Sequence, residues 1–217
     1  MLIIRVCVLA LLPLLLGACG AIGAIAANAD REGSHKVPAA VRALEGRSFA
    51  LLVQADRSIQ GEHPLLLEYL TRNITQRLAA SDNTPRASGF VPADEVLKFT
   101  YDSPSWPLKS KAELSQALGG VERLVIVELI EYRLHDPGNR YVWDGRAAAT
   151  VSVFEGSAST SELALTEKSL SVRFPDTIGQ DEEMLNVRVV NSALAQRLID
   201  RVAWLFYDHE EPNAIKY

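Results

Sequence analysis

A long hairpin pattern in the middle of the chain constrains the fold most. Residues 121–135 place apolar side chains on both faces of an extended chain, which is typical of a strand in the centre of a sheet. Residues 136–139 read Asp-Pro-Gly-Asn, a turn sequence. Residues 141–154 and 165–174 then alternate apolar and polar side chains, as strands with one covered face do. We therefore expect a three-stranded antiparallel meander.

The segments around this meander predict helices and two further strands. A short apolar run at 48–54 suits a buried strand, and 89–91 suits a short one. Helices are expected at 64–80, from Pro92, from a capping box at Ser110, and at 181–207. The predicted fold is α/β (α+β), with the order β-α-β-α-α-β-β-β-α. It contains one mixed sheet with helices packed on it, in a single domain at 47–209, followed by a tail at 210–217.

The last predicted helix carries a long apolar stripe. Its cap is expected at Asp181, at the start of an Asp-Glu-Glu run that would place negative charge at the helix N-terminus. Six side chains at helical spacing are expected to point inward: Val187, Val190, Leu194, Leu198, Val202 and Leu205. A stripe of this length predicts that the helix packs across the meander. The alternative is an exposed stripe that docks on a partner.

The N-terminus reads as an export signal. Arg5 precedes an apolar run at 6–16 that is too short to cross a bilayer. Leu16-Gly17-Ala18-Cys19 follows and resembles the lipobox of bacterial lipoproteins at all four positions. The resemblance implies a signal peptide at 1–18, a diacylglyceryl group on the Cys19 sulfur and an acylated new amino terminus. The alternative is an ordinary secretory signal cleaved after Ala18 or a later alanine.

A lipidated N-terminus sets expectations for location. Residues 19–46 are expected to form the lipidated end and a flexible tether, because they begin rich in Ala and Gly and then become polar. Two or three acyl chains would anchor the protein stably in a membrane. Gly20, where an Asp would imply inner-membrane retention, favours the periplasmic face of the outer membrane.

The element order resembles several envelope proteins. These are the α/β domain of the curli-secretion lipoprotein, the penicillin-binding-protein activator lipoproteins and the amino-terminal domain of TolB, with a looser likeness to the lipopolysaccharide-assembly lipoprotein. The resemblance covers about 48–207, with segments at 89–97 and 119–129, neither of which is a functional motif. A likeness at the level of the fold does not by itself specify a function. The combination of a tether and a compact domain without a catalytic motif leads us to expect a non-enzymatic interaction or accessory module for an envelope assembly, transport or cell-wall complex.

Composition excludes several other classes of function. The net charge of −5, without a basic block, argues against nucleic-acid binding. Both cysteines, Cys7 and Cys19, lie in the first twenty residues, so the rest of the chain has neither a disulfide nor a thiolate. The sequence lacks nucleotide-binding and hydrolase motifs, and no two of its four histidines have metal-ligand spacing. We therefore expect a protein-binding module without metal, cofactor or enzymatic activity.

A few residues are candidates for a site. Trp106, Tyr141 and Trp143 lie in a loop and near the hairpin tip, and they would form a partner surface if exposed. The alternative is that they cover the edge of the core. Glu128, in the strand 121–135, would be a buried acid paired with Arg146 in an envelope hydrolase, the alternative function. The alternative is that the sheet face around Glu128 is exposed and carries cross-strand pairs of glutamate and arginine.

Overall fold

The computed structural model describes residues 33–80, 85–156, 162–176 and 185–213. The chain forms two compact units, the segment 38–209 and a unit made from the two chain ends. In the larger unit, five strands form one sheet in the order β3-β2-β4-β5-β6. The strands are β2 (Ser48–Ala55), β3 (Gly89–Phe90), β4 (Arg123–Asp136), β5 (Asn139–Glu155) and β6 (Thr166–Phe174). Strand β2 is parallel to β3 and β4, while β4, β5 and β6 form the expected antiparallel meander.

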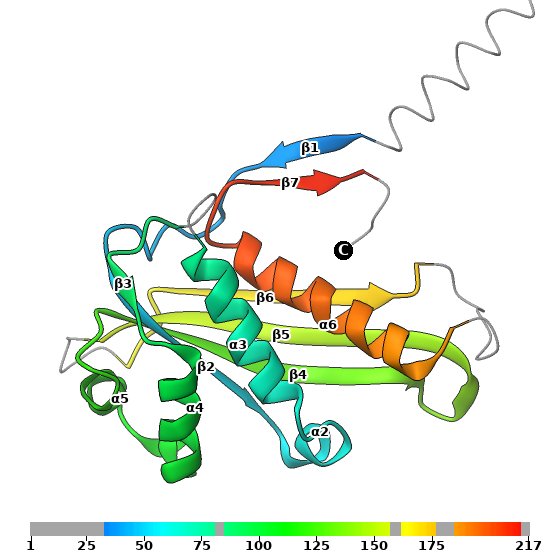
Figure 1. The fold of residues 1–217 in the computed structure, drawn as a ribbon, viewed down its shortest axis with the longest axis horizontal. Coiled ribbons are helices and arrows are strands. Elements are labelled where there is room, and N and C mark those ends of the chain that lie inside the picture. Colours follow the sequence, from blue (N-terminus) through cyan, green and yellow to red (C-terminus); the bar gives the residue numbers. More distant parts are fainter. Residues whose placement is uncertain (1–32, 81–84, 157–161, 177–184, 214–217) are drawn as a thin grey trace, which may run out of the picture. The chain divides into compact units, whose positions relative to one another are not determined.

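Helices cover both faces of this sheet, but unequally (Figure 1). They are α2 (Arg57–Glu62), α3 (Leu66–Ala79), α4 (Ala93–Asp102), the 3₁₀ turn η1 (Trp106–Leu108), α5 (Lys111–Ala117) and α6 (Val187–Trp204). The predicted order is confirmed, with α2 and η1 added where loops were expected. Helices α3 and α6 lie side by side on one face, whereas α4 and α5 lie against the other.

The larger core lies beneath α3 and α6. Alternate side chains of β2, β4 and β5, including Phe49, Val127 and Val151, pack there against Leu70 of α3 and Leu198 of α6. The smaller core lies beneath α4, η1 and α5, and it covers β2, the beginning of β4 and, through Phe154, the end of β5. On the same face further along β4, Ile130 is 56% exposed. Among the described residues, no helix covers this face of the meander around Ile130.

A β-bulge in β4 changes which side chains reach the core. Leu129 pairs with Ala149 and Glu131 with Ala148, so Ile130 is an extra residue in β4. Such an insertion shifts the alternation of side chains that follow it. Tyr132 therefore joins Leu129 in the core under α6, rather than Ile130 on the opposite face as strict alternation predicted.

The folded unit begins earlier than expected. Val41 and Leu44 are buried in the larger core, and the amide of Val41 donates to the carbonyl of Leu205 at 2.8 Å. The compact segment therefore starts at Pro38, and residues 38–46 belong to the domain rather than to the tether. Cys19 and the rest of 1–32 lie outside the described residues.

The chain ends form a small sheet of their own. Strand β1 (Ser34–Val37) pairs with β7 (His209–Pro212), where a tail had been predicted from residue 210. The Ser34 hydroxyl donates to Glu210 at 3.0 Å, and the amide of Asn213 donates to the carbonyl of Gly33 at 2.9 Å.

Helix α6 is shorter than predicted at its N-terminus. It begins at Val187, and the cap is Asn186, whose side chain accepts from the amide of Val189 at 3.0 Å. Asp181 lies outside the described residues. The inward stripe is confirmed for Val190, Leu194, Leu198 and Val202, but Val187 is 53% exposed. No helix in the described ranges is long and apolar enough to cross a bilayer.

Candidate functional site

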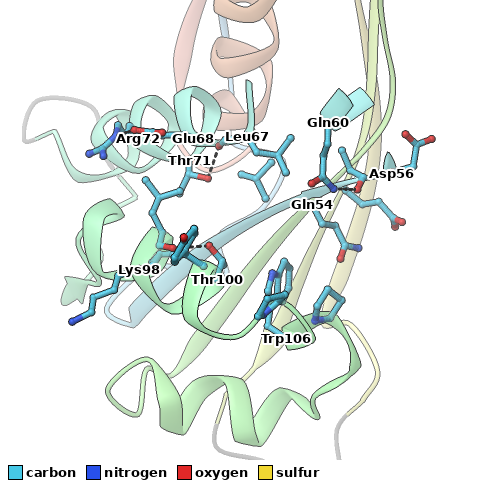
Figure 2. A pocket seen from close by; sticks show the side chains of 18 residues that line it. Gln54, Asp56, Gln60, Leu67, Glu68, Thr71, Arg72, Lys98, Thr100 and Trp106 are labelled. Carbon is cyan, nitrogen blue, oxygen red and sulfur yellow. Dashed lines mark hydrogen bonds and ion pairs between the residues drawn. The ribbon is translucent and has the colours of Figure 1, made fainter. Parts of the chain in front are cut away.

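A cleft of about 800 Å³ opens at the carboxyl end of β2, between α3 and α4 (Figure 2). In open sheets with parallel strands, ligand sites form beyond the carboxyl ends of the strands. The cleft lies in that position because β2 continues to Ala55, whereas its neighbour β3 ends at Phe90. Its lining includes Gln54, Asp56, Gln60, Leu67, Glu68, Thr71, Arg72, Lys98, Thr100, Tyr101, Trp106 and Glu128.

One edge of β2 is open along this cleft. Strand β3 pairs only with Ser48 and Phe49, and the carbonyl of Phe49 accepts from the amide of Val91 at 2.9 Å. Backbone groups of a strand alternate in direction, so Val53 and Ala55 point their N–H and C=O to the same side as Phe49.

Ala55 and Val53 differ in whether their backbone groups on this side have hydrogen-bond partners. The carbonyl of Ala55 accepts from the side-chain amide of Gln60 at 2.7 Å. For Val53, no hydrogen bond on this side joins it to any residue that the structure describes. Val53 lines the cleft. An extended chain entering the cleft would therefore find the N–H and the C=O of Val53 to pair with.

Several charged side chains of the cleft already form hydrogen bonds or ion pairs within the protein. Asp56 caps α2 by accepting from the amide of Ile59 at 2.9 Å and from the Ser58 hydroxyl at 2.8 Å, and these hydrogen bonds lower its pKa. Arg72 donates to Glu68 at 3.0 Å and forms an ion pair with Asp94. These side chains shape the walls, and their charges are already compensated.

Other polar groups of the cleft have no protein partner among the residues in 33–80, 85–156, 162–176 and 185–213. They are the side chains of Gln54, Lys98 and Glu128. The ring of Tyr101, 85% exposed, lies at the rim. A cleft with an amide, an amine, a carboxylate and an exposed ring suits binding of a polar chain.

The predicted environment of Glu128 is wrong. Its side chain is exposed, and it lies opposite Thr150 in the sheet rather than beside Arg146. The neighbouring Glu131 pairs with Arg133 on its own strand. The buried, arginine-paired acid that the hydrolase interpretation required is therefore not formed by Glu128. The alternative expectation, an exposed sheet face with cross-strand ion pairs, describes this region better.

The three aromatic candidates are not brought together. Trp106 is 6% exposed and belongs to the smaller core, with its ring at the base of the cleft. Trp143 is 3% exposed, stacks on His135 at 4.3 Å between centroids, and donates its indole N–H to the carbonyl of Leu185 at 2.9 Å. Both tryptophans are thus core residues and not an exposed surface. Tyr141 is 82% exposed, so its role in contacting a partner protein stays a prediction.

An ionic cluster on the face of the meander opposite α6 was not predicted from the sequence. Asp144 of β5 is 4% exposed and lies among Arg133, Arg146 and Arg173, each from a different strand. Burial by itself would raise the pKa of Asp144, but the hydrogen bond from Arg173 and the charges of Arg173 and Arg146 together lower it. The sequence signal was the alternation of β5, which places Asp144 and Arg146 on one face.

No group of three His, Cys, Asp or Glu side chains in the described ranges is arranged to hold a metal ion.

No protein-family model matches the chain, and no curated protein matches it. Similar solved structures include lipoprotein GNA1162 from Neisseria meningitidis, at 12% identity and a TM-score of 0.45, covering 72% of this chain and 97% of that one. The hypothetical protein CT253 from Chlamydia trachomatis is 17% identical, with a TM-score of 0.39 and coverage of 72% and 95%. PelC from Paraburkholderia phytofirmans, a dodecamer, is 8% identical, with a TM-score of 0.38 and coverage of 81% and 97%.

Proposed function

We propose that this protein is a lipid-anchored module of the bacterial cell envelope that binds an extended segment of another envelope protein and is not an enzyme. Lipid on Cys19 anchors it, at the periplasmic face of the outer membrane. The lipobox resemblance of residues 16–19 supports the anchor. The binding role rests on one observation, the open edge of β2 at Val53 inside the cleft.

Strand addition explains how such a cleft recognises its partner. The backbone of the entering segment pairs with Val53, which supplies affinity without regard to sequence. Side chains then supply specificity. The exposed carboxylate of Glu128 favours a lysine or arginine on the segment, because an opposite charge across an interface selects the partner. Tyr101 covers the segment from the rim.

Site-specific photo-cross-linking in cells tests the binding role. A photoreactive residue replaces Tyr101 at the cleft rim in the full chain, and replaces Leu108 as the control. Leu108 is 88% exposed, but it does not line the cleft. We expect a discrete protein adduct from position 101 only, and a weaker one when Glu128→Lys is added. Equal adducts at both positions, or an adduct indifferent to Glu128→Lys, would refute the cleft as the binding site.

The anchor is tested separately. Mass spectrometry of the mature N-terminus should find a lipidated Cys19, and Cys19→Ser should leave an uncleaved precursor or release soluble protein. An unmodified N-terminus at Cys19, or cleavage elsewhere, contradicts the anchor and leaves the cleft experiment unaffected.

A further inference from the structure

Among the residues that the structure describes, strand β6 is the last strand of the sheet, on the side opposite β3, and its outer edge pairs with no other strand. It is nine residues long, and β5 is its one partner strand in the described ranges. An edge strand of this length is a template for pairing with another chain unless charges, bulges or covering elements prevent it. Glu167, Lys168, Ser169 and Ser171 are all exposed.

The charges of β6 are arranged for pairing with a second copy of β6. In an antiparallel pair of identical strands centred on Leu170, Glu167 of each copy lies directly opposite Arg173 of the other. Residues directly opposite share a face of the sheet, and opposite charges there stabilise the pair. Lys168 meets Val172 in this register and so opposes no like charge. A register centred on Lys168 would instead place the two lysines together.

Within one copy, positive charge is in excess around Arg173, the residue that Glu167 of a second copy would face. Arg146 and Arg173 lie directly opposite each other across β5 and β6, which is unfavourable for like charges. Asp144 is the carboxylate that both arginines contact. Glu167 of a second copy would bring another carboxylate to Arg173. The same pairing would place the two half-buried Leu170 side chains next to each other.

We propose that two copies of this protein pair through β6 in antiparallel fashion, centred on Leu170, to form one continuous ten-stranded sheet across a two-fold axis. The contact is isologous, so it closes at two copies. The occupant of this edge is a second copy of the chain, and the contact lies apart from the cleft at β2.

Disulfide cross-linking tests the partner and its register. Ser169→Cys and Ser171→Cys are carried on two differently tagged full chains, in a background with Cys7→Ser and Cys19→Ser, and co-expressed. Position 169 faces 171 across the proposed axis, close enough for a disulfide. We expect a mixed-tag dimer on oxidation. The control pairs Ser171→Cys with Ser192→Cys, which lies exposed on α6 and should not cross-link.

Charge reversal provides the second readout. Glu167→Arg should lower the 169–171 cross-link at least about tenfold, because it places arginines opposite arginines. Its thermal midpoint is measured to confirm that the variant folds. A 169–171 cross-link no stronger than the control, or one unchanged by Glu167→Arg in a folded protein, would overturn the proposal. Stronger cross-linking of Ser169→Cys to itself would overturn the Leu170-centred register.

Discussion

Asp144 on β5 accepts a hydrogen bond of 2.7 Å from Nε of Arg173 on β6. The carboxylate is buried, while the arginines around it remain partly exposed. This pair joins two strands of the meander on the face opposite α3 and α6, in a part of that face where no helix of the described residues lies. Its energetic role can therefore be measured separately from helix packing.

Replacing Asp144 with Asn should destabilise the domain by about 1–3 kcal/mol, because charged hydrogen bonds are lost in a buried position. The free energy of unfolding in urea measures the effect. Asp94→Asn is the matched control, since it removes an exposed carboxylate from its ion pair with Arg72 and should cost less than about 1 kcal/mol. Equal losses for both variants would contradict a special role for Asp144.

The same carboxylate should contribute to acid denaturation. The pKa of Asp144 is lower in the folded protein than in the unfolded chain, so the unfolded chain binds more protons in this range. Its stabilising contribution is present above the unfolded pKa of about 4 and is lost as the pH falls through the folded pKa. Urea midpoints measured below about pH 4 should therefore decline less steeply in Asp144→Asn than in the parent. Parallel declines would contradict this assignment.

The two buried tryptophans should behave as core residues. Trp106→Ala and Trp143→Ala should each cost about 3–5 kcal/mol, because large cavities form and, for Trp143, the bond to Leu185 is lost. Tyr141→Ala should change stability by less than about 0.5 kcal/mol. Chemical denaturation distinguishes these outcomes. Unchanged stability in either tryptophan variant would return that residue to the list of candidate surface contacts.

Leu198→Ala should destabilise the domain by about 2–5 kcal/mol, because Leu198 is completely buried between α6 and the sheet. Val189 provides a control on the same helix, being 45% exposed, and Val189→Ala should cost less than about 1 kcal/mol. A neutral Leu198→Ala variant would mean that the stripe of α6 is an interface rather than core.

The start of the domain can be tested by truncation. A chain beginning at Arg47 lacks the buried side chains of Val41 and Leu44 and the bond from Val41 to Leu205. It should be less stable than a chain beginning at Pro38 by about 3–6 kcal/mol, at roughly 1.5–3 kcal/mol for each buried side chain. Equal urea midpoints would place the boundary at residue 47 as first predicted.

Local interactions explain why much of the fold could be predicted from sequence. The capping box at Ser110 and Glu113 is present as predicted, because both partners lie within one turn. The strands β2, β4, β5 and β6 follow their apolar patterns to within two residues. The spacing of apolar side chains indicates where these strands and helices form, and this spacing depends only on residues close together in the chain.

Long-range packing decided what periodicity could not. The bulge at Ile130 turns Tyr132 into the core, where its hydroxyl donates to the Asn191 side chain at 2.8 Å. Asp144 is buried because arginines from three strands converge on it, and the cleft exists because β3 ends before β2. By itself the sequence determined the five strands of the main sheet, the helices α3 to α6, their order and the lipobox resemblance. Which faces they bury, and which strand edges stay open, depended on contacts between residues far apart in the chain, whose geometry exists only in the folded protein.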